Sequence, residues 1–294
     1  MNAFLLNAPA YRTERMTRKA DLASMLETLV AVALRAGEEI LRVYESADMG
    51  ERIKADGSPV TQADAAAEVI ILEALAHHWP DIPVVAEESV CAGQIPTVGA
   101  RFFLVDPLDG TAEFVQRSGE FTVNIALIEE GRPTVGVIYL PVTGEVFRGS
   151  PDGAERADFV KGEPLVWTKI RARGVPAQGL SVIASRRSRS VGLEDYLARL
   201  PVAETVRASS SLKLCRLAEG KADLYPRFGR TMAWDIAAGD AILRAAGGCV
   251  WTFDGEPLTY GPNRVPDDEM FANPYFVASG AFDPSDLVTG DAPS

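Results

Sequence analysis

The stretch Asp106-Pro107-Leu108-Asp109-Gly110-Thr111 follows a short apolar run, and the interpretation of the whole chain starts from it. Its two aspartates are three residues apart across a turn restrained by Pro107, so both carboxylates and the Leu108 carbonyl can face one point. Gly110 lets the backbone approach closely, its N–H and that of Thr111 can hold a phosphate oxygen, and the Thr111 hydroxyl can orient a water. Asp-Pro and Asp-Gly are also ordinary turn dipeptides, so the stretch alone leaves a plain turn open.

Further acidic residues stand where an apolar run ends or a helix begins. Glu87 and Glu88 follow the run at residues 82–86, and Asp235 opens a predicted helix after Trp234. Alone, the glutamates would be a solvated pair, and Asp235 a favourable residue for a helix N-terminus. Together, such carboxylates repel one another unless cations lie between them, and an all-oxygen set favours Mg²⁺ or Mn²⁺ over zinc.

The composition excludes several other classes of protein. The 294 residues carry a net charge of −12, the opposite of what a general nucleic-acid binder needs. Only two histidines occur, His77 and His78, which leaves little material for catalysis by a histidine-assisted serine or cysteine. A D-x-D-x-T haloacid-dehalogenase motif is also excluded, because two residues and not one separate Asp106 from Asp109.

The cysteines and the lengths of the apolar runs predict where the protein is located. Three widely spaced cysteines (Cys91, Cys215 and Cys249) fit neither a disulfide framework nor a zinc site. No apolar run approaches the roughly 18 residues of a membrane span, and residues 1–16 do not read as a signal peptide. We expect a cytoplasmic protein without integral membrane association, acting on a small molecule, as a monomer or a homodimer.

Helical and strand patterns alternate along the chain without a regular βαβ repeat. The spacing of apolar residues predicts helices over residues 21–44 and 62–78. Residues 121–128 and 133–140 are predicted to form an antiparallel hairpin. These patterns indicate a layered α/β fold with two tightly packed halves. We assign residues 1–20 and 283–294 to tails, residues 21–168 to an N-terminal half with the metal site, and residues 169–282 to a C-terminal half with substrate contacts.

Several blocks of the sequence, in order, resemble the Mg²⁺-dependent inositol-monophosphatase superfamily. They are Val84-Val85-Ala86-Glu87-Glu88-Ser89, the stretch 106–111, and Trp234-Asp235-Ile236-Ala237-Ala238-Gly239. Within that superfamily the chain is most similar to the bacterial 3′(2′),5′-bisphosphate nucleotidases, through residues 54–64, 119–127, 210–213 and 224–229. The resemblance covers residues 36 to about 278 and implies the sugar-phosphatase fold, with alternating αβαβα layers.

The resemblance implies a role for each matching residue. Glu87, Asp106 and the Leu108 carbonyl would hold one Mg²⁺, and Asp106, Asp109 and Asp235 a second. Asp64 and Glu87 would lie near a third, weaker ion and near the attacking water that Thr111 positions. Gly110 and Thr111 would bind the phosphate that is cleaved, and Ser211, Lys213 and Arg227 the phosphate that stays.

The implied reaction is the direct hydrolysis of 3′-phosphoadenosine 5′-phosphate to AMP and phosphate by a metal-activated water, without a covalent intermediate. 3′-Phosphoadenosine 5′-phosphosulfate is a second candidate substrate. An inositol or sugar monophosphatase and a non-catalytic nucleotide-binding protein remain as alternatives. Arg227 could instead be a structural residue bonded to carbonyls, and Lys213 a solvated helix residue. The chain departs from the family's usual residues at Ala86, Ala112 and Ser209.

Overall fold

The computed structural model describes residues 8–54, 57, 59–185, 192–262 and 270–287, with side chains from residue 20 onward. Ala55, Asp56 and Ser58 of the stretch 54–64, and residues 1–7 and 288–294 of the predicted tails, lie outside the described residues. The helices are α1 (Ala8–Tyr44), α2 (Gln62–His78), α3 (Glu87–Cys91), α4 (Thr111–Val115), α5 (Leu193–Leu197), α6 (Leu212–Ala218), α7 (Ala233–Ala245) and the 3₁₀ helix η1 (Pro284–Leu287).

Two main sheets organise the chain, and a short ribbon pairs β1 (Arg52–Ile53) with β2 (Pro59–Val60). The seven-stranded sheet runs in the order β3 (Val84–Ala86), β4 (Arg101–Asp109), β5 (Thr122–Glu129), β6 (Arg132–Tyr139), β7 (Glu145–Ser150), β8 (Gly153–Asp158) and β9 (Thr168–Ile170). The five-stranded sheet runs in the order β11 (Val202–Ala208), β10 (Leu180–Ser185), β12 (Leu224–Arg227), β14 (Phe276–Ser279) and β13 (Cys249–Thr252).

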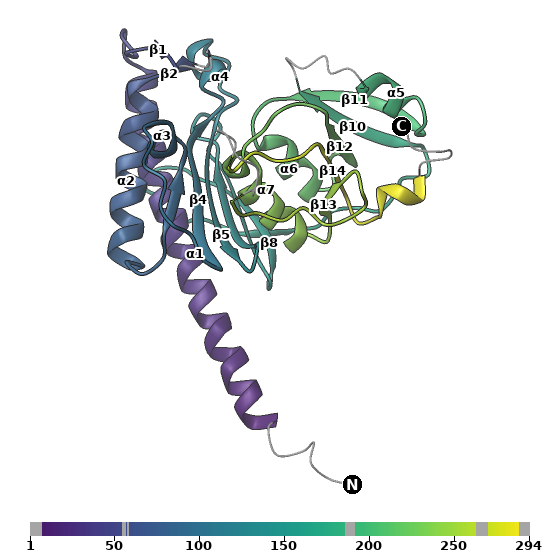
Figure 1. Ribbon diagram of the computed structural model, residues 1–294, viewed down its shortest axis with the longest axis horizontal. Coiled ribbons are helices and arrows are strands. Elements are labelled where there is room, and N and C mark those ends of the chain that lie inside the picture. The colour runs from purple at the N-terminus through teal and green to yellow at the C-terminus, as the bar shows by residue number, and fades with distance from the viewer. Residues whose placement is uncertain (1–7, 55–56, 58, 186–191, 263–269, 288–294) are drawn as a thin grey trace.

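Strand β4 shows how the larger sheet comes to be covered on both faces. Phe103 and Val105 point into one apolar cluster with helices α1 and α2, and Phe102 and Leu104 point into the other with α6 and α7. Successive side chains of a strand face opposite sides, so an unbroken apolar run requires cover on both faces. Figure 1 shows α1 and α2 on the outer face and α7 between the two sheets.

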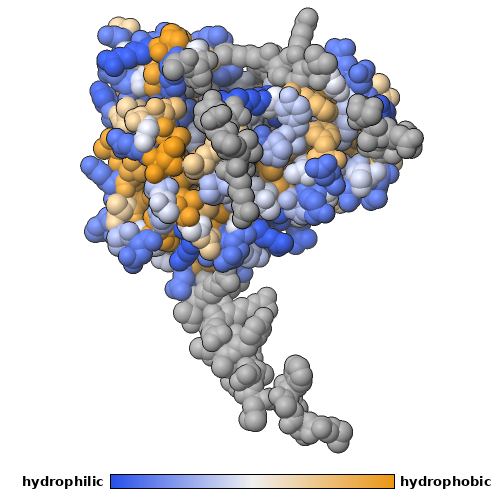
Figure 2. Space-filling view, viewed as in Figure 1, coloured by the Kyte–Doolittle hydropathy of each residue, from blue (hydrophilic) through white to orange (hydrophobic). Residues whose placement is uncertain are grey.

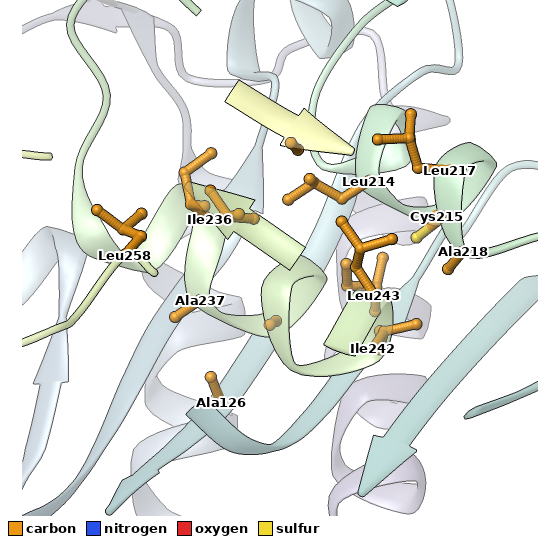
Figure 3. Packing of buried hydrophobic residues seen from close by; sticks show 14 of the residues in the cluster. Ala126, Leu214, Cys215, Leu217, Ala218, Ile236, Ala237, Ile242, Leu243 and Leu258 are labelled. Carbon is orange, nitrogen blue, oxygen red and sulfur yellow. The ribbon is translucent and has the colours of Figure 1, made fainter. Parts of the chain in front are cut away.

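Helix α7 lies unusually close to the larger sheet, because two strands carry glycine beneath it. A Cβ atom on Gly136 would lie 2.3 Å from the Ala238 carbonyl oxygen, and one on Gly149 would lie 2.6 Å from the Ile242 Cα. Figure 3 shows the side chains of α7 packed between Ala126 of β5 and the residues of α6. This close packing fixes the height of the α7 N-terminus, which carries Asp235, above the sheet.

The smaller sheet adds two further layers. Its inner face packs on α6 and α7 through residues such as Tyr225 and Phe276, and a second cluster around Leu180 and Leu224 includes side chains of α5. The order of layers is therefore αβαβα, and the predicted fold class is confirmed. The division into halves at residue 168 stays a prediction, and β9 carries the larger sheet two residues past it.

The surface shows no sign of a membrane span in the described part of the chain. Figure 2 shows hydrophobic residues gathered over α2, where Val69 is 54% exposed, with hydrophilic residues around them. No helix there is both long enough and apolar enough to cross a bilayer.

Three elements differ from the sequence-based expectations. Helix α1 begins at Ala8, so the helix extends into the segment that we assigned to the tail. Strand β4 continues to Asp109 instead of ending before Asp106. Strand β11 was not predicted, because five consecutive exposed residues leave it without an apolar alternation.

An ion-pair network joins α6 to the larger sheet. Glu145 of β7 accepts hydrogen bonds from Arg216 of α6 at 2.8 and 2.9 Å and from Arg156 of β8 at 3.1 and 3.3 Å. Burial alone would raise the pKa of Glu145, but the hydrogen bonds and charges of Arg216 and Arg156 outweigh it and lower the pKa to about 2. The network holds the helix that carries Lys213.

We predict that Glu145→Gln lowers the free energy of unfolding by about 2 kcal/mol at neutral pH, since it removes the charge that pairs two arginines. Because the folded pKa is depressed, this stability is present above the ordinary pKa of 4.5 and is lost as the pH falls toward 2. Denaturant unfolding between those pH values measures the difference. Glu155→Gln, at the half-buried pair with Arg148, is the control and should cost less than about 1 kcal/mol.

Candidate active site

The end of β4 forms the floor of the site. The pairing of β4 with β5 is irregular between Asp106 and Asp109, and the Leu108 N–H donates to Asp106 Oδ1 at 3.0 Å. Gly110 follows with φ at 98°, and a Cβ atom there would lie 2.3 Å from Ser210 Oγ. Both the left-handed backbone and the close contact therefore require glycine at this position.

Asp64 is brought to the same loop by the start of α2. Its Oδ2 accepts from the Thr61 N–H at 2.8 Å and the Thr61 hydroxyl at 2.7 Å, which completes a capping box. Its Oδ1 accepts from the Thr111 hydroxyl at 2.9 Å. Asp64 and Thr111, which are 47 positions apart in sequence, are thus brought together as predicted.

Glu87 and Glu88 begin the short helix α3, and two side chains from other elements hold them. Lys54 Nζ lies 2.6 Å from Glu87 Oε1 and 2.6 Å from Glu88 Oε1. Buried Glu68 of α2 accepts from the Glu88 and Ser89 N–H groups, each at 2.8 Å. A carboxylate at these free N–H groups stabilises the start of α3 and fixes the turn that carries Glu87.

Ser211 links the carboxylate of Asp109 to the backbone carbonyl of Asp235. The carboxylate of Asp235 accepts from the Met232 N–H at 2.8 Å at the start of α7. Ser211 donates its N–H to Asp109 Oδ2 at 2.7 Å, and its hydroxyl lies 3.0 Å from Asp109 Oδ2 and 2.6 Å from the Asp235 carbonyl oxygen. Helices α6 and α7 are thereby attached to the end of β4.

The electrostatics of this region suit divalent cations. Burial, then the negative charges of Glu87, Asp109, Asp235 and Asp64, raise the pKa of Asp106 well above its ordinary value. Burial and the charges of Asp109 and Glu87 do the same to the pKa of Asp235. Within the described residues, no three acidic, histidine or cysteine side chains are already arranged around one ion position. The oxygen-only donor set and its uncompensated charge nevertheless fit Mg²⁺ or Mn²⁺.

A cleft of about 410 Å³ opens beside these acids. Lys213 and Arg227 contribute positive charge to its wall, opposite in sign to Asp109 and Asp235, which also line it. Lys213 is only 7% exposed, with its Nζ 2.6 Å from the Ser210 carbonyl oxygen, so it is not a solvated helix residue. An anion in this cleft would therefore meet buried positive charge close to the acidic cluster.

Two predicted phosphate contacts also have structural partners. The guanidinium of Arg227 donates to the carbonyl oxygens of Gly229 and Arg230 and to the Ser185 hydroxyl, while the residue still lines the cleft. Ser211 is 3% exposed, and its donors go to Asp109 and Asp235. Their roles as substrate contacts stay predictions.

Sequence reasoning assigned no role to Lys54, Glu68 or Asn124, whose Nδ2 donates to the Ser211 hydroxyl at 2.9 Å. Lys54 lies in a stretch that carries the family resemblance, which was a signal for it. Glu68 and Asn124 stand inside a helix and a strand, where the sequence shows no sign of their distant partners.

The site and fold agree with a known family. The inositol monophosphatase family pattern matches residues 21–269, and the chain belongs to the inositol monophosphatase family. The 3′(2′),5′-bisphosphate nucleotidase CysQ of Escherichia coli O157:H7 is 43% identical over 256 residues, which cover 87% of this chain and 99% of the relative. The protein of the same name from Salmonella typhimurium is 45% identical over 253 residues, covering 86% and 98%.

Solved structures give the same result. The crystal structure of CysQ from Bacteroides thetaiotaomicron, a bacterial member of the inositol monophosphatase family, matches with a TM-score of 0.72 at 35% identity. It covers 88% of this chain and 98% of that one. Inositol monophosphatase from Anabaena matches with a TM-score of 0.66 at 26% identity, covering 90% and 94%.

We predict that Lys54→Gln lowers the free energy of unfolding by about 3 kcal/mol in a chelating buffer, because it leaves a largely buried glutamate pair without its cation. Lys161→Gln is the control. Its side chain is 85% exposed beside Glu38, so the loss should stay below about 1 kcal/mol. Denaturant titration of both variants measures the difference, and equal losses would contradict a charge-compensating role for Lys54.

Proposed function

We propose that this chain is a Mg²⁺-dependent phosphomonoesterase that hydrolyses adenosine 3′,5′-bisphosphate to AMP and phosphate. The observation that carries the proposal is a cluster of buried and partly buried acids from four separate elements, beside a cleft that Lys213 and Arg227 line. Two relatives that are 43% and 45% identical are named 3′(2′),5′-bisphosphate nucleotidase, which supports the same activity.

The acids suggest which residues would hold the cations. Glu87, Asp106 and the Leu108 carbonyl would bind one Mg²⁺, and Asp106, Asp109 and Asp235 a second. Asp64 and Glu87 would lie near a third, weaker ion. Bound Mg²⁺ supplies positive charge that lowers the pKa of water and stabilises the oxygens around phosphorus.

The chain's own groups position the reactants. The Thr111 hydroxyl, whose oxygen lies 2.9 Å from Asp64 Oδ1, orients the attacking water together with that carboxylate. Gly110 stands at the N-terminus of α4 with a left-handed backbone, and its N–H and that of Thr111 would bind the phosphate that is cleaved. Positioning and charge neutralisation are the main demands of phosphoryl transfer.

The second phosphate distinguishes this substrate from an inositol monophosphate. Lys213 and Arg227, with Ser211 behind them, would hold the phosphate that remains on the nucleotide. Relatives in the same family are named inositol monophosphatase, so an inositol or sugar monophosphate is the alternative substrate. A non-catalytic nucleotide-binding protein is the alternative from another class, but Asp64, Glu87, Asp106, Asp109, Thr111 and Asp235 are all present.

A cytoplasmic location remains part of the proposal. Cys91, Cys215 and Cys249 form no disulfide with one another, which is consistent with a reducing compartment. The small-molecule substrate requires no polymer-binding surface, and the acidic net charge of −12 agrees with that.

The substrate is tested by comparing initial rates on adenosine 3′,5′-bisphosphate and inositol 1-phosphate with Mg²⁺. We expect kcat/KM to favour the bisphosphate by on the order of a hundredfold or more, because only that substrate occupies the cationic wall of the cleft. Faster turnover of inositol 1-phosphate would assign the monophosphatase reaction instead. Nucleotide binding without any release of phosphate would support the non-catalytic alternative.

We predict that Asp109→Asn and Asp235→Asn each reduce kcat by on the order of a thousandfold, since a carboxylate ligand is worth several kcal/mol of transition-state charge stabilisation. For Asp235→Asn the metal-free protein should be at least as stable as wild type, because a repelling buried charge is removed. Mg²⁺ should raise its melting temperature less than it does in wild type. Exposed Asp254→Asn is the control, and near-normal turnover in either site variant would refute the ligand assignment.

A further inference from the structure

Ser209, Ser210 and Ser211 are successive, and the first two line the cleft. Within the described part of the chain, only one of the three hydroxyls lacks a partner. Ser211 Oγ bonds to Asp109 and the Asp235 carbonyl, and Ser210 Oγ lies 3.0 Å from the carbonyl oxygens of Asp109 and Glu120. Ser209 also lines the cleft and is 5% exposed, but its Oγ has no hydrogen-bond partner among the described residues.

The backbone around Ser209 is held in place, and the unpaired Oγ atom is itself buried beneath the surface of the cleft. The Ser209 N–H donates to Glu120 Oε2 at 3.1 Å, and Ser210 has a left-handed backbone with φ at 52°. A buried hydroxyl without a partner destabilises the folded protein, whereas alanine would carry no such cost. Such a cost is tolerated most readily where a ligand later provides the missing hydrogen bond.

The surroundings of Ser209 indicate what kind of ligand atom would accept a hydrogen bond from its hydroxyl. Lys213 Nζ donates to the carbonyl oxygen of Ser210, so the ammonium group is bonded to the residue that follows Ser209. Both residues line the same cleft, which Arg227 of β12 also lines. Phosphate oxygens only accept hydrogen bonds, and a serine hydroxyl can turn among three staggered positions to donate one.

We propose that the Ser209 hydroxyl donates a hydrogen bond to the phosphate that remains on the nucleotide, next to Lys213. This inference rests on the proposed function, and it adds a contact for which the chain itself provides the unpaired donor. Ser209 is then a specificity residue, because it contacts a group that monophosphate substrates lack.

The chain offers a matched control at Ser181. Its Oγ is likewise buried and unpaired among the described residues, and the residue is 3% exposed. Ser181 stands in β10, where its N–H donates to Asp223 Oδ2 at 2.7 Å, and it is not among the residues that line the cleft. Ser181→Ala therefore makes the same chemical change without the predicted loss of a ligand contact.

The test uses the full-length protein with Ser209→Ala, Ser181→Ala and Lys213→Ala. Calorimetric titration with AMP in Mg²⁺ buffer measures binding of the retained phosphate. We expect Ser209→Ala to weaken AMP binding roughly tenfold, the size expected for a hydrogen bond to a charged group, and Ser181→Ala less than about twofold. Thermal unfolding of free Ser209→Ala should occur at or above the wild-type temperature, because only an unpaired hydroxyl is lost.

Comparing kcat/KM on two substrates identifies the phosphate that Ser209 contacts. Ser209→Ala and Lys213→Ala should reduce kcat/KM for adenosine 3′,5′-bisphosphate but leave that for adenosine 3′-monophosphate, which lacks the retained phosphate, nearly unchanged. Equal losses on both substrates, unchanged AMP affinity, or a lowered unfolding temperature of Ser209→Ala would each overturn the inference. Wild-type protein that neither binds AMP nor releases phosphate from the bisphosphate would instead reject the proposed function.

Discussion

Mutual repulsion among buried carboxylates is the constraint on which this structure depends. Asp64 and Asp106 are buried and Glu87, Asp109 and Asp235 are partly buried. They come from α2, α3, β4 and α7, and the repulsion among them would fall if these elements moved apart. Each is held by hydrogen bonds that its own element or a neighbour provides: Thr61 to Asp64, Lys54 to Glu87, the Leu108 N–H to Asp106, Ser211 to Asp109 and the Met232 N–H to Asp235. The fold thus stores negative charge that divalent cations would neutralise.

The layered architecture explains how these acids meet. The larger sheet presents the end of β4, and α2 and α3 bring Asp64 and Glu87 to it from the outer layer. Helix α7 can lie close to the sheet because Gly136 and Gly149 leave room, and its N-terminus then delivers Asp235. Lys213 of α6 and Arg227 of β12 place positive charge on the wall of the cleft, which Asp109 and Asp235 also line.

Some elements were predictable because local patterns were strong. Residues 62–78 form the predicted helix, since Thr61 and Asp64 complete a capping box that short-range contacts alone specify. Strand β11 was missed because its residues are exposed, and an edge strand without an apolar alternation resembles a loop. Glu68 was missed for another reason: its partners at Glu88 and Ser89 are set by the packing of α2 against α3.

By itself the sequence determined the acidic loop at residues 106–111, the oxygen-only donor set and the layered α/β class, because these depend on local spacing and residue type. The order of the layers was implied only by the family resemblance. Only the tertiary structure decided that Lys213 is buried, that Arg227 also binds carbonyl groups, and that Ser209 keeps an unpaired hydroxyl in the wall of the cleft. The physical reason is that burial and hydrogen-bond partners depend on which distant segments pack together, and local spacing carries no record of that packing.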